Sequence, residues 1–141
     1  MRLVIIESPY AGTSRWRVVR WFQTLRNTEY ARRCVRHSLG RGEAPIASHL
    51  LYTQPGILDD NIPEERQWGI DAGLAWRVKV DASIVYTDHG ITKGMSYRIK
   101  AAEDAGIPVE YRMIDSASAS GTGWVRVGYL ARRIWNMWRA A

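Results

Sequence analysis

The chain has 141 residues, a length that suits one domain and leaves too little sequence for a second independent one. It carries 20 Lys and Arg against 14 Asp and Glu, for a net charge of +6, and the arginines gather in the first 41 residues and near the C-terminus. The single cysteine, Cys34, excludes an internal disulfide and a cysteine zinc site, and no apolar stretch resembles a signal peptide or a membrane span of ~20 residues. We therefore expect a cytoplasmic protein that does not enter a membrane.

The first predicted element is a strand. Residues Leu3 to Ile6 form a continuous apolar run, as expected of a strand that is covered on both faces. A polar, glycine-containing turn follows, and in an open α/β sheet the carboxyl ends of the strands are where ligands bind. The turn is equally compatible with side chains that only satisfy one another. The candidate ligand contacts here are Glu7, Ser8, Pro9 and Tyr10.

Two helices are predicted next. Residues 14–26 favour a short amphipathic helix or an irregular segment, and Asn27 then caps a second helix that runs to Leu39. Tyr30, Ala31 and Cys34 fall on one face of this second helix, with several arginines opposite. We expect that face to pack against the sheet.

A second strand is predicted over residues 44–48. His49 follows it, where it can contact a ligand or bond to a backbone carbonyl, and no second His or Cys lies close enough in sequence to suggest a metal site. The candidate ligand contacts in this stretch are Ser48, His49 and Tyr52.

A helix is predicted from Pro63 to Val80. Proline suits the first helical turn, and the two glutamates that follow complement the helix dipole. Asp59 and Asp60, just before it, are compatible with magnesium ligands, but a loop that leads into a helix explains them more simply, so no metal is predicted. Apolar residues on much of the circumference predict burial between the sheet and another surface.

A strand, loop, helix, strand unit covers residues 81–113. Apolar residues 82–86 predict a strand, Thr92 caps a helix that runs through Ala105, and residues 109–113 predict a further strand. A carboxylate at Asp88 suits ribose hydroxyls or a base edge, although it can equally cap the turn, and the loop amides suit phosphate. The candidate ligand contacts are Asp88, Gly90, Thr92, Gly94 and Met95.

The C-terminal segment differs in composition. Residues 115–123 are rich in Ser and Gly, which predicts a flexible loop, and residues 124–141 place apolar residues and arginines at helical spacing. This basic amphipathic helix is compatible with packing on its own domain, a second subunit, RNA or a membrane surface, and we favour its own core and a subunit interface. We predict one domain, 1–141, with its core in 1–114.

Several motifs occur in a recognisable order: ESPYAG (7–12), N-x-x-YAR-x-C (27–34), RGEAPIASHLLY (41–52), PEER-x-x-GI-x-AG (63–73) and YTDHGIT-x-GM (86–95). Together they resemble an uncharacterised, often phage-encoded branch of the nucleoside 2-deoxyribosyltransferase-like proteins, a group related in fold to the nucleotide-binding SLOG superfamily. The resemblance covers residues 3–112. It implies an α/β fold of the flavodoxin-like or Rossmann-like kind, with four or five parallel strands, that binds nucleosides, nucleotides or ADP-ribose-like molecules. It also suggests a homo-oligomer, in the host cytoplasm if phage-encoded.

The sequence departs from these relatives at the catalytic position. The resemblance implies a Glu nucleophile in the helix after the fourth-strand loop, where a carboxylate attacks the anomeric carbon. Two alignments place Gly94 or Arg98 there, and neither is a nucleophile. Glu7 and Asp88 remain as candidate catalytic carboxylates, so the sequence leaves open whether the protein is an enzyme.

Three functions follow as hypotheses. The first is a nucleotide-binding or ADP-ribose-binding protein without turnover, which sequesters or senses a signal nucleotide. The second is an enzyme that cleaves or exchanges an N-glycosidic bond, of the deoxyribosyltransferase or nucleotide N-ribohydrolase type. The third is nucleic-acid binding through the Arg/Trp-rich segments. No cofactor is predicted.

Overall fold

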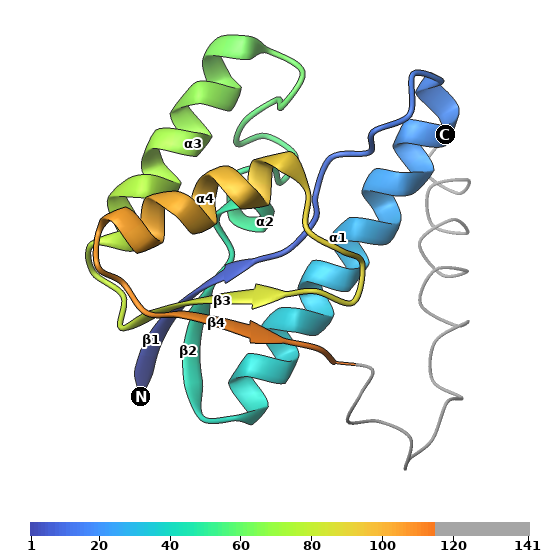
Figure 1. Ribbon diagram of the computed structural model, residues 1–141. Coiled ribbons are helices and arrows are strands. Elements are labelled where there is room, and N and C mark those ends of the chain that lie inside the picture. Colours follow the sequence, from blue (N-terminus) through green and yellow to red (C-terminus); the bar gives the residue numbers. More distant parts are fainter. Residues whose placement is uncertain (115–141) are drawn as a thin grey trace.

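The structure is a computed structural model that describes residues 1–114. Within these residues eight helices and strands follow one another (Figure 1). They are β1 (Arg2–Glu7), α1 (Arg17–Gly40), β2 (Glu43–Ile46), α2 (Ser48–Leu51), α3 (Pro63–Arg77), β3 (Ala82–Tyr86), α4 (Lys93–Asp104) and β4 (Val109–Arg112).

The four strands form one parallel sheet in the order β2-β1-β3-β4. The predicted α/β class and Rossmann-like architecture are confirmed, with four strands in the described part of the chain. The chain runs from β1 to one neighbour, β2, and then crosses to the other side of β1 to form β3. The carboxyl ends of β1 and β3 therefore mark the topological switch point, where ligands bind in such sheets.

Helices cover both faces of the sheet (Figure 1). On one face α1 packs Tyr30 and Cys34 against Val4, Ile6 and other strand residues that share their face. On the other face α4 packs Met95 and Ile99 against Val85, and α3 lies against α4. The strand side chains alternate between these two clusters, as a sheet covered on both sides requires.

One long helix replaces the two that the sequence predicts over residues 14–39. Asn27 does not cap a new helix, because it is buried within α1 and its side-chain Nδ2 donates to the carbonyl of Tyr10 at 3.0 Å. The predicted inner face is confirmed: Asn27, Tyr30, Ala31, Cys34 and Ser38 are buried. The helix ends at Gly40, and Gly42 takes a φ of +78° in the turn that follows.

Two other elements end earlier than predicted. The second strand ends at Ile46, because Ser48 already begins the short helix α2. Helix α3 ends at Arg77 rather than Val80. Its Gly73 and Arg77 are buried, whereas Trp68 and Trp76 are exposed, so the described residues do not supply the second surface that the sequence predicts over this helix.

The unit from β3 to β4 forms as expected. Thr92 caps α4, where its Oγ1 accepts from the amide of Met95 at 3.3 Å, and Gly106 closes the helix with a φ of +69°. The predicted loop at 115–123 and helix at 124–141 lie outside the described residues. Within residues 1–114, no helix combines the length and apolar character needed to cross a membrane.

Candidate functional site

The switch point brings the predicted stretches together. Glu7 pairs in register with Val85, so the residues after β1 and those after β3 leave the same edge of the sheet. Helix α2 joins them, because the hydroxyl of Ser8 lies 2.9 Å from Nε2 of His49. The residues that follow β1, β2 and β3 therefore lie near one edge of the sheet, although most of their side chains are engaged inside the protein.

Glu7 lies beneath the edge rather than on it. The residue is 1% exposed, and its two oxygens accept from two arginines, from Nη2 of Arg77 at 3.0 Å and from Nε of Arg98 at 2.5 Å. Arg77, from α3, is buried, whereas the side chain of Arg98, from α4, is 21% exposed. Glu7 thus holds Arg98 in place instead of facing a ligand itself.

Ser8 and His49 form a buried polar pair. Burial lowers the pKa of His49 to about 3, with the positive charge of Arg98 as a smaller cause, so the ring is neutral at neutral pH. Its Nδ1 has no hydrogen-bond partner among the described residues. The ring of Tyr10 meets the imidazole edge to face at 6.2 Å, which places Tyr10 on the outer side of this pair.

Asp88 ties three segments together. The hydroxyl of Tyr30 donates to its carboxylate at 2.5 Å, and the amide of Ile114 donates to the same group at 2.9 Å. His89 stacks on the ring of Tyr30 at 4.0 Å. Burial, and then the bond to Asp88, raises the pKa of Tyr30. Asp88 therefore anchors the loop after β3 to α1 and to the chain after β4.

The start of α4 offers accessible backbone. Gly90 has a φ of +76° and is exposed, and a Cβ added at Gly94 would meet open space. The side chain of Thr92 serves as the helix cap, and that of Met95 is buried against β3 and α4. From this stretch a ligand would meet backbone amides rather than these two side chains.

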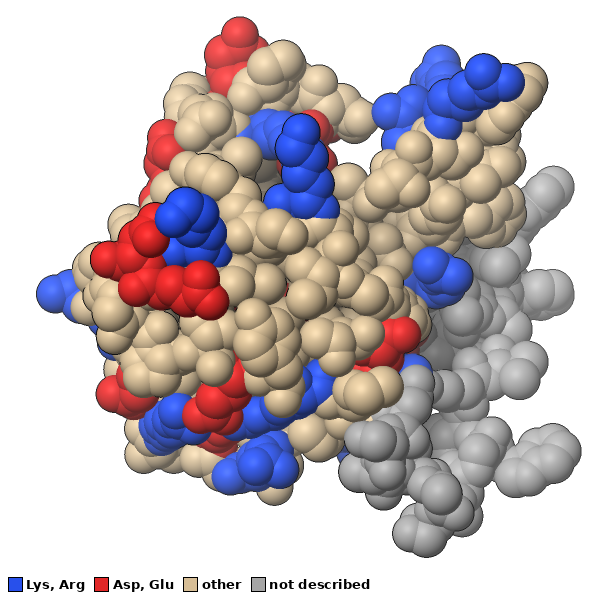
Figure 2. Space-filling model, in the orientation of Figure 1, with Lys and Arg blue, Asp and Glu red and all other residues tan. Residues whose placement is uncertain are grey.

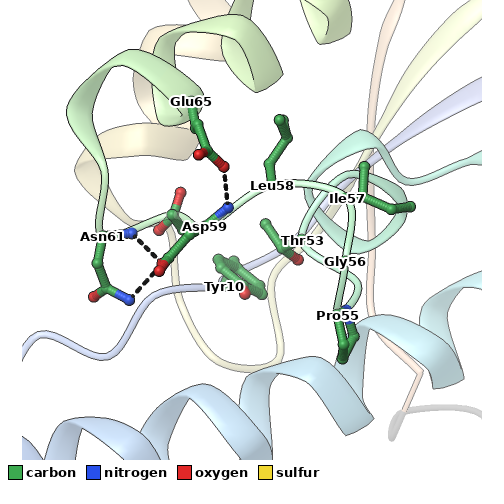
Figure 3. A pocket seen from close by; sticks show the side chains of 10 residues that line it. Tyr10, Thr53, Pro55, Gly56, Ile57, Leu58, Asp59, Asn61 and Glu65 are labelled. Atoms are coloured by element: carbon green, nitrogen blue, oxygen red, sulfur yellow. Dashed lines mark hydrogen bonds between the residues drawn. The ribbon is translucent and has the colours of Figure 1, made fainter.

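A cavity of about 520 Å³ lies beside the edge (Figure 3). It is open to solvent, and Glu65 accepts from the amide of Asp59 at 2.6 Å on one wall while Asp59 accepts from Asn61. The Asn61 hydrogen bonds lower the pKa of Asp59. The cavity is lined by Tyr10, Thr53, Pro55, Gly56, Ile57, Leu58, Asp59, Asp60, Asn61 and Glu65.

The remaining predicted contacts lie apart from this cavity. Tyr52 accepts a hydrogen bond from the indole of Trp76 at 2.9 Å, and Ser48 is buried against Gly73, where an added Cβ would lie 2.8 Å from its hydroxyl oxygen. Pro9 is buried. Among residues 1–114 no three His, Cys, Asp or Glu side chains are grouped as metal ligands would be.

Sequence reasoning missed the two arginines that carry the charge of the site. Arg77 follows an apolar stretch, and its partner Glu7 is 70 residues away in sequence, so no local pattern signals the pair. Arg98 lies on α4 one turn beyond Gly94. The sequence did contain one signal for Arg98, because it is a basic residue in the helix that follows the predicted ligand-binding loop.

The comparisons with known proteins place the domain without naming an activity. No curated protein and no solved structure matches the chain. A family model described as a domain of unknown function, DUF7768, matches residues 2–112. Because this match spans most of the 141 residues, the chain belongs to the DUF7768 family.

Proposed function

We propose that the edge of the sheet at β1 and β3 binds a nucleotide or an ADP-ribose-like molecule. The position of Arg98 carries this proposal. Glu7 fixes its Nε, while its partly exposed guanidinium lies on the helix whose N-terminal amides face the same edge. An arginine beside a helix N-terminus offers fixed donors and positive potential, which suit a phosphate.

The lining of the adjoining cavity suits the sugar and base of a nucleotide better than a second phosphate. Its volume, about 520 Å³, lies within the range of small-molecule sites. Its wall combines the ring of Tyr10 and the apolar Ile57 and Leu58 with the acceptors Asp59 and Glu65. Aromatic and apolar atoms suit a base, and carboxylates accept hydrogen bonds from ribose hydroxyls. The motif resemblance to nucleoside-binding proteins supports the same ligand class.

Binding without turnover is better supported than cleavage of an N-glycosidic bond. A carboxylate that attacks an anomeric carbon must reach it, and both candidates are held in internal contacts, Glu7 by two arginines and Asp88 by Tyr30 and Ile114. A protein that holds such a molecule intact would sequester or sense a signal nucleotide. Chromatography of nucleotides incubated with the protein tests this, and released base that depends on Asp88 would favour the enzyme instead.

Calorimetry with AMP, ADP, dTMP and ADP-ribose tests the proposed site. We expect at least one to bind the full chain, and Arg98→Ala to weaken that binding at least tenfold, because the fixed phosphate donor is lost. Lys100→Ala is the matched control, since Lys100 lies on the same helix but pairs with Asp104 in solvent. Its affinity should stay within twofold of the parent.

Two results would contradict the proposal. In one, the folded protein binds none of these molecules at millimolar concentration. In the other, Arg98→Ala and Lys100→Ala weaken binding equally, which would indicate a general effect of charge. Retained cooperative unfolding in each variant shows that the fold is intact.

The start of α1 favours nucleic-acid binding as a second candidate function. Residues 14–28 contain four arginines and no acidic residue, and basic atoms cover this end of the helix (Figure 2). Trp16 and Trp21 are exposed there, and the guanidinium of Arg15 lies over the ring of Trp16 at 5.4 Å. Stacking rings beside arginines suit single strands. Fluorescence titration with oligonucleotides should then show affinity that falls steeply with salt.

A further inference from the structure

The N-terminal half of α1 carries an exposed apolar stripe. Val18, Trp21, Phe22 and Leu25 follow the i, i+3, i+4, i+7 spacing that aligns side chains on one helix face, and they are 41–67% exposed. The buried residues of α1, such as Asn27, fall on the opposite side of the helix by the same period. The stripe therefore points away from the sheet.

This half of α1 is nevertheless held in place. The loop before it donates backbone amides to the helix, from Gly12 to the hydroxyl of Thr24 at 3.0 Å and from Thr13 and Ser14 to the side-chain oxygen of Gln23 at 2.9 and 3.0 Å. In Figure 1 this end of α1 extends beyond the sheet. A fixed helix with an exposed row of large apolar residues is typical of an interaction surface.

We propose that this stripe is the docking site for residues 124–138 of the same chain. That segment repeats apolar residues at helical spacing, so as a helix it presents a complementary apolar face. Its arginines fall elsewhere around the helix, so they stay in water when the two apolar faces meet. The apolar residues are Trp124, Val127, Ala131, Ile134, Trp135 and Trp138, and the arginines are Arg126, Arg132, Arg133 and Arg139.

The connection is long enough. The described chain ends at Ile114, which packs against the cluster that contains Tyr30, in the middle of α1. From Tyr30 to the centre of the stripe is about 13 Å along the helix. Residues 115–123 can span up to about 30 Å when extended. Residue 124 therefore reaches either end of the stripe without strain.

A segment of the same chain also has the advantage over a second copy. A short linker gives its segment an effective concentration in the millimolar range, above that of a free protein at micromolar concentration.

Hydrogen exchange of the full chain, followed by mass spectrometry, tests the proposal with a matched pair of variants. Val18 on the stripe and Val78 after α3 are both 67% exposed. We expect amides in 124–138 to exchange at least tenfold more slowly than unstructured peptide. Val18→Asp should remove this protection, because a carboxylate enters the apolar contact, and Val78→Asp should leave it unchanged. Protection of β3 in every sample reports an intact fold.

Three outcomes would overturn the proposal. The segment exchanges at the unstructured rate in the parent chain, or its protection is the same in Val18→Asp and Val78→Asp, which would place it elsewhere. The third is a dimer in sedimentation velocity that Val18→Asp dissociates, which would make a second copy the occupant. A monomer whose protection depends on Val18 supports docking within one chain.

Discussion

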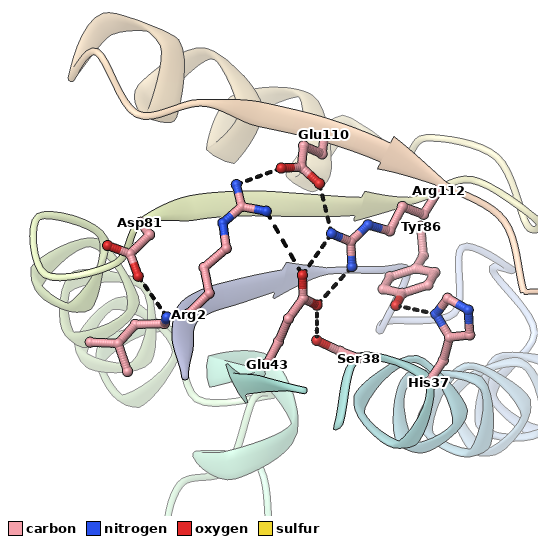
Figure 4. A network of polar contacts seen from close by, with 9 residues as sticks. Arg2, His37, Ser38, Glu43, Asp81, Tyr86, Glu110 and Arg112 are labelled. Carbon is pink, nitrogen blue, oxygen red and sulfur yellow. Dashed lines mark hydrogen bonds and ion pairs between the residues drawn. The ribbon is translucent and has the colours of Figure 1, made fainter. Parts of the chain in front are cut away.

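Glu7 and Glu43 are two buried carboxylates of the same sheet, each held by arginine. Glu7 ends β1 at the carboxyl edge, on the face covered by α3 and α4. Glu43 begins β2 at the opposite edge, on the face of α1, where Arg112 donates from Nη1 at 2.7 Å and from Nη2 at 2.8 Å, and Ser38 at 2.6 Å (Figure 4). Chemically similar groups therefore occupy opposite faces of the sheet.

The two groups differ in the donors that remain. Around Glu43 the network is closed, because Arg112 also donates to Glu110 at 2.6 Å and Arg2 pairs with Glu110. Around Glu7 it is open: Nε and Nη1 of Arg77 have no partner among the described residues, and only Nε of Arg98 is bound to Glu7. A closed network stabilises the fold, whereas around Glu7 the buried Arg77 keeps unpaired donors and the guanidinium of Arg98 stays partly exposed to a ligand.

The largest expected effect is at Glu7. Glu7→Leu leaves the buried guanidinium of Arg77 without its carboxylate, and breaking such a pair costs roughly 3–5 kcal/mol of the free energy of unfolding. Urea denaturation followed by circular dichroism measures this loss. The double variant Glu7→Leu, Arg77→Leu should recover part of it, because no unpaired charge remains. A loss below about 1 kcal/mol in the single variant would contradict the importance of the pair.

Lowering the pH should remove the stabilisation that His49 contributes and the stabilisation that Glu43 contributes in different pH ranges. His49 has a pKa of about 3 in the fold against 6.5 when unfolded, so its contribution is complete above 6.5 and falls as the pH drops toward 3. The slope is about 1.4 kcal/mol per pH unit while only the unfolded state takes up the proton. Burial also lowers the pKa of His37, which adds to the slope. Urea midpoints at pH 7, 6 and 5 should fall steadily, and less steeply in His49→Gln. Equal midpoints would show that His49 is not buried as a neutral ring.

Glu43 should contribute less than Glu7, and its contribution should be lost at a lower pH than that of His49. The hydrogen bond from Arg112 lowers the pKa of Glu43 from 4.5 to about 2, so its stabilisation is present above 4.5 and is lost as the pH falls toward 2. Glu43→Gln should cost about 1–3 kcal/mol at neutral pH, as for a hydrogen bond to a charged group. Glu110→Gln, at the more exposed partner of Arg112, should cost less than 1 kcal/mol. Urea denaturation measures both losses. A larger loss in Glu110→Gln than in Glu43→Gln would contradict the view that Glu43 is the more important partner of Arg112.

A much smaller effect on stability than that of Glu7→Leu is expected at Arg98. Glu7 keeps Arg77 when Arg98 is replaced, so Arg98→Ala should lower the free energy of unfolding by about 1 kcal/mol. Lys100→Ala, which breaks an exposed pair, should lower it by less than about 0.5 kcal/mol. Thermal denaturation of both variants would show this. A loss at Arg98 as large as that in Glu7→Leu would make it a structural residue rather than one kept for a ligand.

The sequence predicted the features that depend on neighbouring residues. The apolar runs of β1 and β3, the Thr92 cap and the buried face around Tyr30 all follow from local periodicity and capping chemistry. The convergence of loops at one edge follows from parallel strands. What it could not predict depends on distant partners: Asn27 remains within a helix because it bonds to Tyr10, and Glu7 is buried because two arginines reach it.

For a related reason the sequence did not show which surface the first half of α1 meets. An apolar stripe such as Val18, Trp21, Phe22 and Leu25 has the same pattern whether it meets the sheet or another surface. Only the length of α1 relative to the sheet decides that this half lies beyond it. In the same way, Trp68 is exposed because no other element among residues 1–114 covers that side of α3.

The small size of Gly12 determines how closely the loop between β1 and α1 packs on α1. A methyl group at this position would lie 2.4 Å from the carbonyl oxygen of Arg20, closer than atoms can approach, so the loop and α1 touch through their backbones. Gly12→Ala would force them apart, and Tyr10, two residues earlier, would shift with the loop. A hydrogen atom in place of a side chain at Gly12 thus lets the loop that carries Tyr10 lie directly on α1, at a residue that does not itself line the cavity.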